Sequence, residues 1–252
     1  MHWQEQSVIL SSKPFSENCR LVSVFNRSMG KTSGLVKGTK SVIHVGDISD
    51  VTWKGRNADQ LGTFKIETVF SPFSFVFENP LEILAIDSVC TLCSNGLPDR
   101  APHGKLFDSV KRFLLELVHK DWLLNYVFFE KMFLSEVGLG LSLSQCAVTG
   151  KKEGLFYVSP RTGKAVIKEV GEKYKDKLFV LPKFLLDGAA SLSDFDGVAY
   201  PSNEDILMAL KITQHFLKIY FCGISSRELP MSREYLVQGL LKGDKNETQY
   251  YN

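Results

Sequence analysis

The residue with the clearest potential for metal chemistry is Cys146, in the stretch LSQCAVTGKKEGLFYVSPRTGKAVIKE at 143–169. The stretch has the layout of a small zinc knuckle: a short turn, a hairpin bend at Gly163 and a basic return. Structural zinc is held by four Cys or His side chains, commonly as paired C-x-x-C turns. Here Thr149 stands three positions after Cys146, and 164–169 contains no cysteine. The stretch is therefore either a metal site that has lost its ligands or a hairpin that never bound metal.

A second possible metal-binding pair is Cys90 and Cys93, which form one C-x-x-C. The pair falls in a predicted helix, on the same apolar side as Ile83, Ile86 and Leu97. A buried free cysteine packs like a small hydrophobic residue. Because no second C-x-x-C or His pair is nearby, we interpret both cysteines as packing residues and predict no metal site.

No arrangement of catalytic residues is recognisable. The stretch MGKTSG at 29–34 resembles the end of a P-loop, but Phe25 stands where the signature needs its first Gly. The surrounding pattern predicts strand–turn–strand, which provides no helix N-terminus for a phosphate. Neither a nucleophile elbow nor paired carboxylates are found. We therefore predict no enzyme, no catalytic residues and no cofactor; an enzyme with an unrecognised site is the weakest of three alternatives.

Basic and aromatic side chains in the first part of the chain suit nucleic-acid binding better than chemistry. Residues 1–40 contain six Lys or Arg and two Glu, so their formal charge is +4, against +2 for the whole chain. Single strands need cations along the phosphates and flat side chains for stacking. Trp53 and Phe15 are of the right type, although each taken singly is better explained as a core residue of the barrel. The predicted DNA-binding residues are Lys31, Lys37, Lys40, Lys54 and Arg56.

The elements that position these residues differ between the two parts of the chain. The first eighty residues contain about five short segments rich in Val, Ile, Thr and aromatics, separated by Pro, Gly, Asn and Asp. Five short strands favour a small closed barrel of the OB type, because closure removes exposed edges. From Pro80 the period becomes helical: PLEILAIDSVCTLCSNG starts with Pro and ends in Asn-Gly, and 104–121 carries an apolar stripe at helical spacing.

Composition limits the class of protein. The hydrophobic fraction is 44% and the charged fraction 23%, which is typical of a globular protein. No apolar run is long enough for a membrane span, and we see no secretory signal at the start. Five cysteines at scattered spacings do not form a disulfide framework. We expect a reducing, cytoplasmic location.

Several weak motifs in the right order resemble the bacterial recombination mediator family RecO. The opening SVILSSKPFSENCRLVSVFNRSMGKTSGLVKGTKS is similar to the family's first strands, turn and V-A-K-G-A-R-R element, here Leu35 to Lys40. LPDRAPHGKLFDSVKRFLLEL resembles the entry into its helical part, and FFEKMFLSEVGLGLSLSQCAVTG resembles a further element ending in Cys146. The likeness runs almost from end to end.

This resemblance implies binding and annealing without covalent chemistry. A RecO-like protein binds single- and double-stranded DNA, engages the acidic C-terminal tail of single-strand-binding protein, and acts with RecR to load RecA at gaps in the RecFOR pathway. It implies a cytoplasmic, nucleoid-associated protein. The family's basic motif falls on Lys37 and Lys40 and its turn lysine on Lys31, while Ser41 replaces a third basic residue. Candidate partner-binding residues are Lys111, Arg112, Lys120 and Trp122.

The resemblance also answers the question raised by Cys146. Many members carry two C-x-x-C pairs around this hairpin, whereas this chain keeps one cysteine, so we predict a variant without zinc whose loop is held by packing. The predicted fold is α+β: an OB-type five-stranded barrel at 1–79, a helical bundle domain at 80–243 with a degenerate zinc-knuckle hairpin inserted at 143–178, and a polar tail at 244–252. The main alternative function is a protein–protein adaptor of the repair machinery with little DNA affinity of its own.

Overall fold

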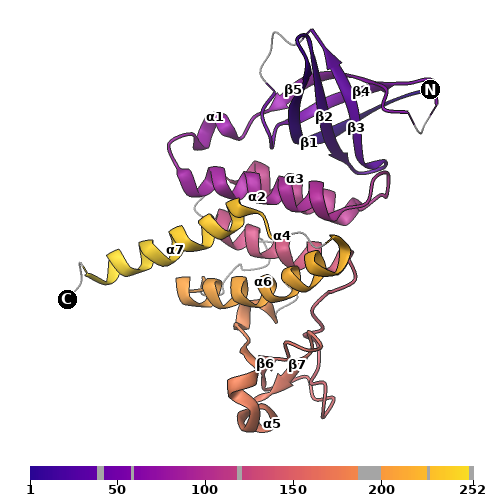
Figure 1. Ribbon diagram of the computed structural model, residues 1–252. Helices are drawn as coiled ribbons and strands as arrows, with labels where there is room; N and C mark the ends of the chain where they lie inside the picture. Colours follow the sequence, from indigo (N-terminus) through magenta and orange to yellow (C-terminus); the bar gives the residue numbers. More distant parts are fainter. Residues whose placement is uncertain (39–42, 58–59, 118–120, 187–199, 226–227, 250–252) are drawn as a thin grey trace. The chain divides into compact units, whose positions relative to one another are not determined.

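The computed structural model describes residues 1–38, 43–57, 60–117, 121–186, 200–225 and 228–249 (Figure 1). By their internal contacts the residues form two compact units. The first is Met1–Lys120 with Pro230–Leu236, and the second is Asp121–Leu229 with Val237–Asn252. Each unit is treated by itself below. The boundary between residues 79 and 80, the insertion at 143–178 and the tail at 244–252 remain predictions.

A closed barrel forms the start of the first unit (Figure 1). Its strands are β1 (His2–Ser16), β2 (Cys19–Asn26), β3 (Gly30–Lys37), β4 (Ile48–Lys54) and β5 (Thr63–Phe70), in the order β1-β2-β3-β5-β4. The long β1 pairs with β2 and β4, and β3 meets β5 in parallel at Leu35 and Thr63. This order is that of an OB-type barrel, so the predicted fold class is confirmed.

Alternation along the strands builds the barrel interior. Successive side chains of a strand point to opposite faces, so every second residue of a half-buried strand is apolar. In β4, for example, Val51 and Trp53 are buried, whereas Asp50 and Lys54 are exposed. The core of the barrel consists of Ile9, Val22, Val24, Val36, Val51, Trp53 and Phe64. The outer face is thereby left for polar residues.

Three helices follow the barrel in the first unit: α1 (Phe73–Val76), α2 (Pro80–Gly96) and α3 (Gly104–Glu116). The Asn79 side chain accepts a hydrogen bond from Leu81 N, and Pro80 starts α2 where a helix tolerates the missing N–H. At the other end, Leu97 N donates to the Cys93 carbonyl over 3.1 Å. Both ends of α2 agree with the sequence prediction.

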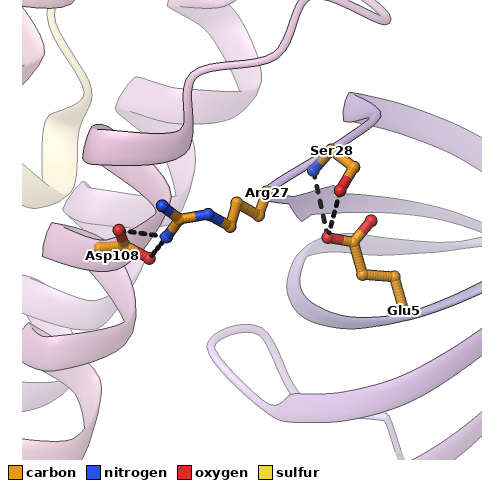
Figure 2. Close-up of polar contacts among 4 residues, drawn as sticks. All are labelled: Glu5, Arg27, Ser28 and Asp108. Carbon is orange, nitrogen blue, oxygen red and sulfur yellow. Dashed lines mark hydrogen bonds and ion pairs between the residues drawn. The ribbon is translucent and has the colours of Figure 1, made fainter.

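The apolar stripe of α3 packs towards β2. Phe107 meets the buried Phe25 ring edge to face, with 5.7 Å between ring centroids. Beside this contact, the Arg27 guanidinium pairs with both carboxylate oxygens of Asp108, and Glu5 accepts hydrogen bonds from the backbone and hydroxyl of Ser28 (Figure 2). The β2–β3 turn is therefore fixed on one side by β1 and on the other by α3.

In the second unit α4 (Trp122–Glu136) packs against α6 (Asn203–Ser225). As its sequence predicted, α4 is buried on nearly all sides. The carboxylate of its buried Glu130 accepts a hydrogen bond of 2.5 Å from the Thr213 hydroxyl of α6. A last helix, α7, spans Met231–Gln249. None of the described helices is long and apolar enough to cross a membrane.

Between α4 and α6 in the chain lies a small sheet with strand order β7-β6-β8. Its strands are β6 (Leu155–Val158), β7 (Ala165–Ile167) and β8 (Phe179–Val180), and they are joined by short helices α5 (Lys168–Gly171) and η1 (Glu172–Lys177). A further short helix, η2 (Lys183–Leu185), follows. The hairpin bend sits at Gly163, whose φ of 67° is the left-handed conformation that suits glycine. His215 of α6 bonds the Pro160 carbonyl over 2.9 Å.

Candidate nucleic-acid interface

Three lysines lie on one outer face of the barrel, across β3, β5 and β4. Lys54 pairs with Thr63 in the β4–β5 register, and Thr63 pairs with Leu35 in the β3–β5 register. Alternation then places Lys37, two residues beyond Leu35, on the same outward face as Lys54 and Lys65. All three side chains are exposed. We call these three lysines, together with Arg56 after the end of β4, the basic face.

The charge of the basic face is partly offset by neighbouring carboxylates. Lys65 pairs with Glu67 over 2.6 Å. This hydrogen bond, and then the charge of each partner, raises the pKa of Lys65 and lowers the pKa of Glu67. Both side chains are highly exposed, so solvent screens the interaction and leaves both groups accessible. Asp50 of β4 is also exposed. The face is basic, but not uniformly so.

Lys31 has a different environment from Lys37, the other lysine of β3. Its side chain is only 14% exposed, and its ammonium group donates to the Ser94 carbonyl over 2.7 Å and pairs with Asp99 over 3.2 Å. Gly30 beside it has a φ of +68°, and a Cβ there would lie 2.0 Å from the Ala101 carbonyl oxygen. The chain after α2 therefore passes tightly along the start of β3. Lys31 holds this segment, so the geometry favours Lys37 over Lys31 as a phosphate contact.

The remaining predicted DNA-binding positions have separate outcomes. Arg56 is exposed in the loop after β4, while Lys40 lies outside the described residues. Trp53 belongs to the barrel core, with its indole Nε1 donating to the Leu61 carbonyl over 3.3 Å. Phe15 is 60% exposed near the end of β1. The DNA-binding role of the predicted set remains a proposal.

Sequence reasoning missed Lys65 as a member of the basic face. A signal for it exists in TFKIETVF, where Phe64 and Ile66 alternate with Lys65 and Glu67. The alternation predicts which residues point outward, but it does not predict that β5 lies between β3 and β4. That neighbour relation, which brings Lys37 and Lys54 to either side of Lys65, follows from the parallel β3–β5 pairing.

The predicted partner-binding residues are divided between the two units. In the first unit, Lys111 is half-buried and Arg112 exposed on α3. Trp122 begins α4 in the second unit and is only 9% exposed, so it packs inside that unit. Lys120 lies outside the described residues. The structure thus leaves Lys111 and Arg112 as the accessible members of the predicted set.

The hairpin around Cys146 is held by a small apolar cluster. Cys146, Tyr157, Val166 and Ile167 are buried together, with Leu155 and Phe156 packed against them. This confirms the prediction that packing of the hairpin residues holds the loop. The donor set does not fit zinc, because Cys146 has Thr149 where a second thiol would stand and no Cys or His follows in 164–169. That the protein contains no zinc stays a prediction.

The environment of the Cys146 sulfur still favours a thiolate. Burial opposes this, but hydrogen bonds from the Thr149 hydroxyl and from the backbone N–H groups of Ile167, Thr149 and Val148 lower the pKa of Cys146 to about 7. Cys90 and Cys93 are the opposite case: both are fully buried in α2, and burial raises the pKa of each thiol. At Cys146 the hydrogen-bond donors outweigh burial and favour the charged sulfur, whereas at Cys90 and Cys93 burial outweighs the stabilising contacts.

Comparisons with known proteins cover nearly the whole chain. The family model described as Recombination protein O N terminal matches residues 1–73, and the one described as Recombination protein O C terminal matches residues 78–222. The chain is 34% identical to the DNA repair protein RecO of Rhodospirillum centenum over 94% of each chain. It is 33% identical to the RecO protein of Granulibacter bethesdensis over 99% of this chain and 100% of that one.

A relative from Anaplasma marginale, also named DNA repair protein RecO, is 32% identical over 86% of this chain and 91% of its own length. The two family models meet near the end of β5, where the barrel gives way to helices. The strand order, the position of the helices and these matches agree. The chain belongs to the RecO family of recombination proteins.

Proposed function

We propose that this protein is a recombination mediator that binds single- and double-stranded DNA and anneals complementary strands. Membership of the RecO family supports a role in DNA repair. The observation that carries the finer proposal is the exposed basic face of Lys37, Lys54, Lys65 and Arg56 on the barrel. Two polyanionic strands repel each other, and a surface that neutralises phosphates lowers the cost of their approach.

The proposal includes the partners that this family implies. The protein would act at gaps coated with single-strand-binding protein, recognise the acidic C-terminal tail of that protein, and assist RecA loading together with RecR. An acidic tail needs cations beside an apolar surface. Lys111 and Arg112 of α3 are the proposed cations. No step of this function breaks a covalent bond in the DNA.

A salt-dependent DNA titration tests the electrostatic part of the proposal. We expect a labelled single-stranded oligonucleotide to bind tightly at low salt and much more weakly at high salt, measured by fluorescence anisotropy. Replacing Lys37 and Lys54 together by Ala should weaken binding and reduce the slope of log K against log salt by about 1.4, since each phosphate contact contributes about 0.7 for single strands. Absence of binding at low salt contradicts the proposal.

A matched control separates the basic face from overall charge. Lys13 of β1 and Lys105 of α3 are exposed lysines outside the basic face. Their joint replacement by Ala removes the same charge, and we expect the slope to stay close to that of the unchanged protein. Equal effects of the two double variants would show that net charge, rather than the arrangement on β3 and β4, controls binding.

One observation favours the adaptor alternative. Around α1 three aromatic side chains are exposed: Phe73 by 38%, Phe75 by 62% and Phe77 by 60%. Contiguous exposed apolar patches are typical of protein–protein contact sites. If the adaptor is correct, replacing Phe75 and Phe77 by Ser abolishes binding to repair-protein partners, while the Lys37 and Lys54 double variant leaves repair activity in cells unchanged. The opposite result supports the DNA-binding mediator.

A further inference from the structure

A pocket of about 270 Å³ opens at the end of the barrel where β1 begins and β4 ends. Because β5 starts beside Leu35, the first residues of β3 have no strand on that side. The walls of this gap come from the chain start, β3, β4 and the segment after α2. The lining residues are Met1, His2, Trp3, Met29, Thr32, Ser33, Trp53 and Arg100.

The β3 wall offers backbone hydrogen-bonding groups. The Lys31 carbonyl accepts from Arg100 N over 2.8 Å, and Leu35 N donates to the Gly62 carbonyl over 3.1 Å. Both bonds point away from β2, so the backbone of Ser33, midway between them, faces the same side. Among the described residues no backbone group pairs with Ser33 there. Ser33 therefore presents one N–H donor and one carbonyl acceptor at the pocket wall.

Thr32 supplies an independent indication of a ligand. Its side chain is 6% exposed, and within the described part of the chain its hydroxyl oxygen has no hydrogen-bond partner. A buried hydroxyl without a partner is costly, and such a group in a native structure calls for an explanation. Ser49 of β4 is likewise buried with an unpartnered hydroxyl, but it does not line the pocket. That difference makes Ser49 a useful control.

The opposite wall is aromatic, and the rim carries positive charge. Trp3 stacks on Trp53 with 6.4 Å between ring centroids and 10° between ring planes. At the rim, the Arg100 guanidinium donates to the Gln60 carbonyl, and the Met1 ammonium donates to the Gly55 carbonyl. Arg100 has a φ of 58°, a costly conformation for a residue other than glycine. The positively charged Arg100 side chain is therefore kept at this rim in spite of an unfavourable backbone conformation.

We propose that the pocket receives one unpaired base of a bound single strand, an inference that rests on the proposed DNA binding and deepens it. A base has a flat ring for Trp3, and donors and acceptors on its edge for Thr32 and Ser33. An aliphatic or phenyl side chain would leave those polar groups unpaired. The phosphates of the same strand continue onto the basic face, since Lys54 pairs with His2 at the pocket mouth.

The proposal predicts that binding depends on bases as well as on charge. An oligothymidylate and an abasic strand of equal length carry the same phosphates and are titrated by fluorescence anisotropy at one salt concentration. We expect the unchanged protein to bind the oligothymidylate at least fivefold more tightly, because a stacked base contributes appreciably to affinity. Equal affinity for the two strands overturns the base pocket while leaving the proposed DNA binding intact.

Replacing Thr32 by Val removes the hydroxyl and keeps the shape of the side chain. The variant should lose about fivefold in affinity for oligothymidylate and nothing for the abasic strand, the effect of one hydrogen bond. Ser49→Ala, which removes an equally buried hydroxyl outside the pocket, should bind both strands like the unchanged protein. If Thr32→Val binds like the unchanged protein, the pocket does not read a base. Should that variant fail to fold, Trp3→Phe gives the same test.

A second measurement distinguishes failure of the pocket from failure of DNA binding. If no oligonucleotide binds at low salt, the proposed function fails, and the pocket is then tested alone by tryptophan fluorescence with deoxyadenosine monophosphate. Quenching in the unchanged protein that Thr32→Val weakens supports a base site. Quenching by an acetylated phenylalanine amide but not by the nucleotide overturns it in favour of a peptide. Absence of quenching by either overturns it as well.

Discussion

The barrel and the Cys146 hairpin are two small β-structures stabilised in different ways. The barrel closes on itself through strand pairing and encloses an apolar core. The sheet β7-β6-β8 is open, its strands are two to four residues long, and its cluster consists of four buried residues. Isolated small sheets are marginally stable unless packing or a metal supports them.

This difference determines which residues of each structure are not needed for stability and are therefore available for binding. In the barrel the interior supplies the stability, so the outward residues of β3, β4 and β5 are available for phosphate contacts. In the hairpin, Leu155 and Phe156 pack against the small buried cluster, and Lys168 lies over the Phe156 ring at 5.1 Å from its centroid. In the hairpin, partly exposed side chains therefore help to hold the loop and are not available for binding.

Truncation of the barrel core should have a large effect on stability. Phe25 is fully buried and meets Phe107 of α3, so Phe25→Ala removes a large apolar side chain and leaves a cavity. We expect the free energy of unfolding to fall by about 3–5 kcal/mol, measured by urea denaturation. Phe15, which is 60% exposed, provides the matched control, and Phe15→Ala should change stability by less than about 0.5 kcal/mol. Similar losses for both variants would contradict the barrel interior described above.

The Cys146 turn should make stability depend on pH in a predictable direction. Its pKa is lowered to about 7 from an ordinary value of 9.0, so folding favours the thiolate. The contribution of the Cys146 thiolate to the free energy of unfolding is fully present above pH 9 and is lost as the pH falls through 7. The free energy of unfolding should therefore rise between pH 7 and 9 by about 2 kcal/mol at most. Cys146→Ser should remove that rise, because serine does not titrate in this range. Identical pH profiles of the two proteins would contradict the assignment.

The ion pair between Arg27 and Asp108 should contribute little (Figure 2). The two side chains are 57% and 45% exposed, so water and salt screen their attraction. We expect Arg27→Ala to destabilise the protein by about 0.2–1 kcal/mol at low salt and by less in 1 M salt. Asp108→Ala should lower the stability by the same amount, and the double variant should be no less stable than either single variant. A loss comparable to that of Phe25→Ala would show that the pair carries more than surface electrostatics.

Local patterns were sufficient to predict the elements of the barrel and the first helices. Alternation in β4 and the Pro-to-Gly span of α2 are properties of neighbouring residues, so the sequence alone indicates them. The parallel contact between β3 and β5 is different, because it depends on which strand fills the gap between β3 and β4. That is why Lys65 was overlooked, although its outward orientation follows from its own strand.

Site prediction was limited for the same reason. Lys31 and Lys37 are both outward residues of β3 and look equivalent in sequence. The end of α2 and the segment after it separate them: Ser94 of α2 and Asp99 lie beside the Lys31 ammonium, and Ala101 approaches Gly30. Trp122 shows a similar limit, since an aromatic residue beside charged residues suggested a surface and the residue is instead buried in α4. Long-range packing decides exposure in both cases.

Removal of metal should have no effect on stability, and this expectation tests the hairpin most directly. Structural zinc contributes folding free energy on the order of 10 kcal/mol in small metal-bound motifs, so a chelator would unfold a hairpin that depended on it. Here the buried cluster around Tyr157 and Ile167 replaces the ligands, and one sulfur cannot hold zinc by itself. We expect the melting temperature to be the same with and without a strong chelator, and elemental analysis to find no zinc bound in equal amount to protein. One tightly bound zinc per chain would show that ligands from elsewhere complete the Cys146 turn, and the contrast with the barrel would then fail.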